Sequence, residues 1–144
     1  MKNEKCKMNG SPAYAATNPR DIQSRTFSFA LRIIKLCRAL EDGPRVGWSI
    51  SRQLMKSGTS IGANMEEATA AQSKADFISK VQISLKEARE TNYWLRLLSA
   101  AEIIDSSKLT EITNESDELC RILGSIVVSA KNNGFAAGRI GDRG

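Results

Sequence analysis

The chain has 144 residues, with 21 Lys and Arg, 16 Asp and Glu, and no histidine. This length suffices for one domain with a hydrophobic core, and the lack of histidine removes the commonest general base and the commonest metal ligand. Because no apolar run approaches bilayer-spanning length and no signal-peptide pattern begins the chain, we expect a cytoplasmic protein without membrane association.

Residues 1–18 are polar and lack periodicity, which predicts a disordered tail. A first helix is predicted to begin at Pro19, because proline suits the first helical turn. Two apolar stripes at helical spacing follow, 27/30/34/37 and 29/33/36/40. A helix that packs on one side needs only one stripe. We therefore expect this helix to be covered on two sides, by its own bundle and by something else.

The segment Glu41-Asp42-Gly43-Pro44 predicts a break, with a second helix beginning near Arg45. Helical spacing of apolar residues then continues through the glycine-containing stretch SGTSIGANMEE, at Ile50, Leu54, Ile61, Met65 and Ala68. We interpret this stretch as mid-helix. Gly58 and Gly62 are four residues apart and share a face, so they let another helix approach closely. A phosphate-binding loop is excluded, because GxxxxGK[ST] is absent.

Ser73 with Asp76 is a variant of the capping box and predicts a third helix that runs to about Ala101. A short turn at residues 105–107 precedes a fourth helix with a heptad seam at Leu109, Ile112, Ser116, Leu119, Leu123, Ile126 and Ala130. Asn132-Asn133-Gly134 ends it, and residues 134–144 are predicted to be disordered. The whole pattern predicts an all-α, up-down-up-down four-helix bundle over residues 19–133.

Polar residues at helical spacing form a strip on the second helix, and a third-helix glutamate could face it. We assign a structural polar layer to Ser57, Ser60, Asn64, Glu67 and Glu87. A buried layer of this kind must be hydrogen-bonded throughout, or it costs free energy. A binding or catalytic cluster and an all-carboxylate metal site remain as alternatives. We assign no catalytic residue, metal ligand or cofactor, and we expect Cys37 and Cys120 to be small core residues.

Positive charge is concentrated early in the chain. Residues 20–56 hold eight basic against three acidic side chains, whereas residues 57–131 hold eight against eleven. This balance suggests an anionic partner, such as nucleic acid, although a solvated helix face would carry similar charges. The residues assigned to phosphate contacts are Arg32, Lys35, Arg38, Arg45, Arg52 and Lys56. Trp48, Tyr93 and Trp94 are candidate base-stacking platforms or core and interface residues.

Four segments together carry a family resemblance: FxxAxxIxxLCRAL, QLMKSGTSIGANMEEA, KADFISKVQISLKEARETNYWLRLL and ELCRILGSIVVSAK. Over residues 22–131 the chain resembles the four-helix bundle family encoded in intervening sequences of bacterial 23S rRNA genes. The resemblance implies homopentameric rings, and it carries over no known catalytic residues. A related branch is the accessory protein of diversity-generating retroelements, which binds nucleic acid and a reverse transcriptase. Where the family often has Ala-Glu-Gly, this chain has Glu66-Glu67-Ala68.

We therefore expect a non-catalytic homo-oligomer, a pentamer by resemblance, that binds RNA or DNA. The alternative is a protein-interaction adaptor, such as an accessory subunit for a reverse transcriptase. The oligomer interface is assigned to apolar and small residues of the first two helices: Phe29, Ile33, Leu36, Trp48, Gly58 and Gly62.

Overall fold

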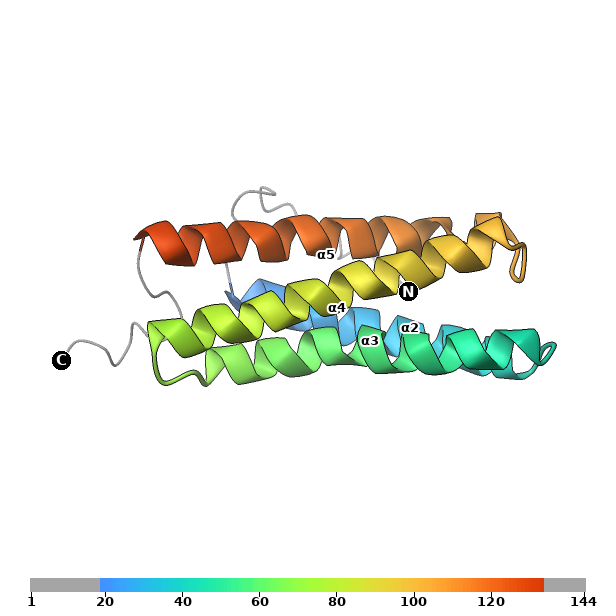
Figure 1. Cartoon of the computed structure of the whole chain (residues 1–144), viewed down its shortest axis with the longest axis horizontal. Helices are drawn as coiled ribbons and strands as arrows, with labels where there is room; N and C mark the ends of the chain where they lie inside the picture. The colour runs from blue at the N-terminus through green and yellow to red at the C-terminus, as the bar shows by residue number, and fades with distance from the viewer. Residues whose placement is uncertain (1–18, 134–144) are drawn as a thin grey trace, which may run out of the picture.

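The structure, a computed structural model, describes residues 19–133. These residues form four helices and no strand: α2 (Pro19–Glu41), α3 (Val46–Thr69), α4 (Lys74–Ala100) and α5 (Ser106–Asn133). Each helix runs back along the one before it, with α4 lying between α3 and α5 and α2 behind (Figure 1). The predicted all-α class and the four helices are confirmed. The two expected tails lie outside the described residues.

Local signals set the helix ends where the sequence predicts them. At the start of α4, the backbone N–H of Asp76 donates to Ser73 Oγ at 3.0 Å, which confirms the predicted cap. At the start of α5, the N–H of Ser107 donates to a carboxylate oxygen of Asp105 at 3.2 Å. Such side-chain acceptors satisfy N–H groups that have no partner inside the helix.

The core is one cluster that draws side chains from all four helices. Every residue of the predicted α5 seam is buried, including Ser116 in its middle. On α2, the stripe 29/33/36/40 faces this core, together with Cys37. Helix packing is extensive between α2 and α3, α3 and α4, and α4 and α5, whereas α2 and α5 touch much less, and the diagonal pairs α2–α4 and α3–α5 do not pack against each other.

The glycine-containing stretch is a continuous part of α3, as predicted. A Cβ added at Gly58 would lie 2.8 Å from both γ carbons of Ile33, and one at Gly62 would lie 3.3 Å from the backbone oxygen of Thr26. The helix that comes close to the two glycines is therefore α2 of the same chain.

This packing corrects part of the predicted oligomer interface. Phe29, Ile33 and Gly58 are buried inside the single chain, so they present no surface to another copy. Leu36 also packs against the core and is only partly buried. The prediction was wrong because both stripes of α2 have helical spacing, and spacing alone does not say which one faces inward.

Candidate nucleic-acid interface

The six cations predicted to contact phosphate are all exposed. Among residues 19–133, none of them forms an ion pair with a carboxylate. Other cations of the bundle are paired: Arg25 contacts Glu115 at 2.8 Å, and Lys80 contacts Glu67 at 2.8 Å. The six predicted side chains therefore differ from Arg25 and Lys80 in having no ion pair within residues 19–133.

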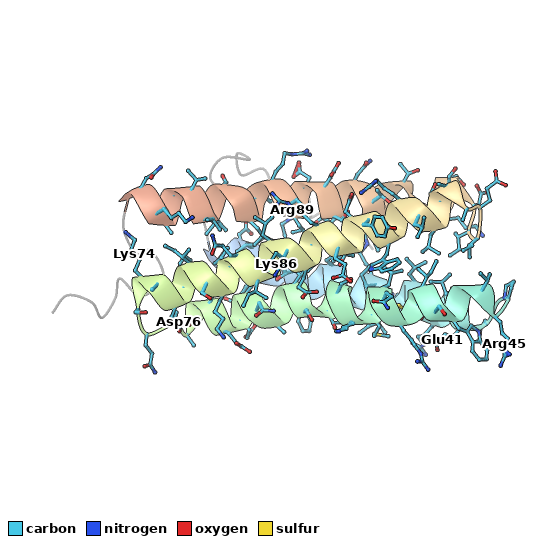
Figure 2. All side chains as sticks on the ribbon, in the orientation of Figure 1. Glu41, Arg45, Lys74, Asp76, Lys86 and Arg89 are labelled. Atoms are coloured by element: carbon cyan, nitrogen blue, oxygen red, sulfur yellow. The ribbon has the colours of Figure 1, made fainter. Side chains whose placement is uncertain are left out.

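The end of the bundle at the α2–α3 turn gathers part of this set. The guanidinium of Arg45 lies over the Trp48 ring, 5.4 Å from its centroid, and the Trp48 Nε1–H donates to the backbone oxygen of Glu41 at 3.2 Å. Figure 2 places Glu41 and Arg45 together at this end. Trp48 and Arg52 line a hollow of about 450 Å³ with Glu41 and Asp42. Two carboxylates thus lie beside the cations there.

The other predicted cations are spread over different sides. Arg32 follows Arg25 by seven residues, and Arg25 reaches Glu115 on α5, so Arg32 lies on the α5 side of α2. Lys56 lies toward α4, close enough to Glu87 to act on its pKa. The structure therefore brings together the cations near the turn and sets Arg32 apart from them.

The predicted polar layer is present in a narrower form between α3 and α4. The hydroxyl of Thr91 lies 2.8 Å from both Ser57 Oγ and the backbone oxygen of Glu87, and Ser84 Oγ donates to the backbone oxygen of Ile61 at 2.8 Å. The side chains of Ser57, Ser84 and Thr91 are buried. These bonds tie neighbouring helices together inside the core, which is a structural role.

Three residues of the predicted layer lie elsewhere. Ser60 and Asn64 bond to carbonyls of their own helix, at 2.7 and 2.8 Å. The side chain of Glu67 is 59% exposed and pairs with Lys80 across the α3–α4 surface. The spacing of these residues predicted a shared strip correctly, but the strip rotates out of the core along α3.

Glu87 is half-buried at the edge of this layer. Burial raises the pKa of the Glu87 carboxyl above its ordinary value, and the Glu90 carboxylate adds to this rise, whereas Lys56 and Lys86 oppose it. Within the part of the chain that the structure describes, no three His, Cys, Asp or Glu side chains are grouped to hold a metal ion.

An apolar groove lies between α2 and α3, and the sequence predicted only the apolar stripe on its α2 side. It has a volume of about 280 Å³ and is lined by Gln23, Phe27, Ala30, Leu31, Ile34, Thr59, Gly62, Ala63 and Glu66. Phe27 is 66% exposed and Leu31 48% exposed. The stripe 27/30/34 therefore faces outward, as the second apolar side of this helix, whereas the predicted interface was assigned to the inward stripe.

Sequence reasoning missed a chain of contacts between α4 and α5. The Asn92 side-chain amide donates to Ser116 Oγ at 2.7 Å, and Arg96 Nε–H donates to Asn92 Oδ1 at 2.8 Å. Arg25 also joins α2 to α5 through two hydrogen bonds to Glu115. The one available signal was a serine within the apolar seam of α5, because a buried hydroxyl needs a hydrogen-bond partner.

Residues 20–125 match the sequence pattern described as the 23S rRNA-intervening sequence protein. The chain belongs to this family. A crystal structure of a protein with unknown function from the S23 ribosomal protein family of Bacteroides thetaiotaomicron VPI-5482 is similar, with 43% sequence identity and a TM-score of 0.67. The similarity covers 74% of this chain and 97% of the other.

No curated protein matches this member of the 23S rRNA-intervening sequence protein family. Within residues 19–133, every helix is too short or too polar to cross a bilayer. The family match covers all of α2, α3 and α4 except the first residue of α2, so it includes the cations near the turn and the apolar groove.

Proposed function

We propose that this protein is a cytoplasmic, non-catalytic bundle that assembles with copies of itself and binds RNA or DNA through phosphate contacts. The observation that carries the proposal is the set of six exposed cations on α2, α3 and the turn between them that form no ion pair with a carboxylate among the described residues. Phosphate contacts of this kind carry little sequence information, and their strength falls steeply with salt.

Self-association is supported by the outward stripe of α2. A groove with exposed Phe27 and Leu31 leaves apolar surface in water, and contiguous patches of this kind mark interaction sites. A second copy seated there would cover it, and a closed ring would repeat the basic surface around one particle. The homopentamer is the state that the family resemblance implies.

The test compares charge reversal at the turn with the same change elsewhere. One variant carries Arg38→Glu, Arg45→Glu and Arg52→Glu, and the matched control carries Lys74→Glu, Lys108→Glu and Lys131→Glu. All six positions are exposed helix or turn residues without an ion pair in the described chain. Affinity for a short structured RNA is measured by fluorescence anisotropy at low and at physiological salt.

We expect the turn variant to lose about tenfold or more in affinity at low salt, and the control to lose much less. Equal losses of affinity in the two variants would refute the assignment of the binding surface to the turn cations. A wild-type protein without affinity for any nucleic acid at low salt would refute nucleic-acid binding. Light scattering on the same samples gives the mass of the particle with and without RNA, and a monomer would refute the assembly.

A second candidate function is a protein-interaction adaptor, such as an accessory subunit for a reverse transcriptase. The observation that favours it is the apolar character of the groove, because nucleic acid is held by charge rather than by apolar side chains. If the oligomer does not bind RNA but still exposes the groove, the adaptor function becomes the conclusion.

A further inference from the structure

Arg96 on α4 is held in place beside an exposed tyrosine. Its Nε–H donates to Asn92 Oδ1, and the Asn92 amide in turn donates to the hydroxyl of Ser116, which is fully buried in the α5 seam. The Arg96 guanidinium carbon lies 5.9 Å from the centroid of the Tyr93 ring. Arginine has five N–H donors, so the terminal nitrogens of Arg96 still have donors to offer.

Tyr93 has surface left for a ligand. Its side chain is 47% exposed, although its ring also meets Trp94 edge-on at 5.1 Å between centroids. The neighbouring acid on this helix, Glu90, accepts a hydrogen bond from Trp94 Nε1–H at 3.1 Å. The Glu90 carboxylate is thus engaged with Trp94.

Three cations share one side of α4 with Tyr93. Lys86, Arg89, Tyr93 and Arg96 are spaced by three, four and three residues, which places them along one face of a helix. All are exposed, and none of the three cations forms an ion pair in the described part of the chain. Figure 2 labels Lys86 and Arg89 along the middle of α4.

A hollow continues this face toward α5. It has a volume of about 350 Å³, and its lining combines Arg96 and Ser99 of α4 with Thr113 and Asn114 of α5. The lining contains hydroxyl, amide and guanidinium groups but no carboxylate. A face with an aromatic ring, unpaired cations and a hollow without carboxylates matches the two parts of a nucleotide, a flat base and an anionic phosphate.

We propose that the α4 face of Lys86, Arg89, Tyr93 and Arg96 binds single-stranded nucleic acid, with one base stacked on Tyr93 and the phosphates on the three cations. This inference rests on the proposed function and adds to it a second surface and the form of the nucleic acid. Single strands are favoured over duplexes because a base must leave its neighbours before its flat face can lie on an aromatic ring.

Two probes separate stacking from charge attraction. A fluorescein-labelled oligouridylate of about 12 nucleotides spans one single-strand site, and an RNA duplex of the same length offers phosphates without free base faces. Anisotropy at low salt is measured for the wild type, Tyr93→Ala and the matched control Tyr93→Phe, which keeps the ring. Because Tyr93 is exposed, both variants should fold, which far-ultraviolet circular dichroism confirms.

We expect Tyr93→Ala to lose about tenfold in affinity for the single strand and less than about twofold for the duplex, and Tyr93→Phe to behave like the wild type. Arg96→Ala should weaken binding and lower the slope of log affinity against log salt by about 0.7, as for one lost phosphate contact on a single strand. Uridine monophosphate at low millimolar concentration should compete weakly, because it offers one base and one phosphate.

The outcomes are distinct. If the wild type binds neither RNA, the proposed function fails and this inference fails with it. If the wild type binds RNA but Tyr93→Ala binds the single strand as tightly as Tyr93→Phe does, the proposed function stands and the α4 site is refuted. The residues would then form an ordinary solvated helix face.

Discussion

Replacing Gly58 by alanine tests the close packing of α3 against α2. In an open helix position this change would raise the free energy of unfolding by about 0.5–1 kcal/mol, because alanine loses less backbone freedom on folding than glycine. Here the new Cβ would lie 2.8 Å from both γ carbons of Ile33 and 3.1 Å from its Cβ. Ile33 is fully buried and branched at Cβ, so it has little room to turn away. Overpacking a tight core costs about 1–3 kcal/mol, and we expect a net loss of about 1–2 kcal/mol.

The assay is urea denaturation followed by helix circular dichroism at one protein concentration, since self-association would shift the midpoint. Gly124→Ala is the matched control, because a Cβ there meets nothing within 4 Å. It should gain about 0.5–1 kcal/mol. In an Ile33→Ala background, Gly58→Ala should become stabilising, a coupling of about 2–3 kcal/mol. The reasoning is refuted if Gly58→Ala stabilises the wild type as Gly124→Ala does.

Three further changes test other parts of the structure. Thr91→Val removes the hydroxyl that meets Ser57 Oγ in the core, so it should lower the free energy of unfolding by about 1–2 kcal/mol in the same assay, and no loss would contradict the bond. Burial and Glu90 raise the pKa of Glu87 above its ordinary 4.5, so between that value and the raised one the folded state binds more protons and stability falls as pH rises. Glu87→Gln should therefore be more stable than the wild type at pH 7 and equal to it at pH 3. Equal stability at pH 7 would contradict the idea that the ionised Glu87 carboxylate destabilises the folded state. Leu31→Glu places a charge in the α2–α3 groove at an exposed position and should reduce the light-scattering mass toward the monomer without lowering helix content, so an unchanged mass would exclude the groove as the contact.

The helix boundaries could be predicted from the sequence because they depend on neighbours in the chain. Pro19 starts α2, Ser73 caps α4, and the spacing of Ile61 and Met65 carries α3 through its glycines. The heptad seam of α5 could also be predicted, since a sustained apolar repeat has one way to be buried. The exposed cations followed from the same logic, because long charged side chains stay in water unless paired.

Only the tertiary structure decided which face of each helix meets which neighbour. Both stripes of α2 have helical spacing, and the inward one is chosen where Ile33 fits against Gly58 of α3. The link from Ser116 through Asn92 to Arg96 joins residues of two helices, so no local pattern contains it. The sequence by itself determines periodicity and caps, which are short-range properties. The register and rotation of the helices arise from close packing between residues that are far apart in the chain. No local sequence pattern specifies that packing.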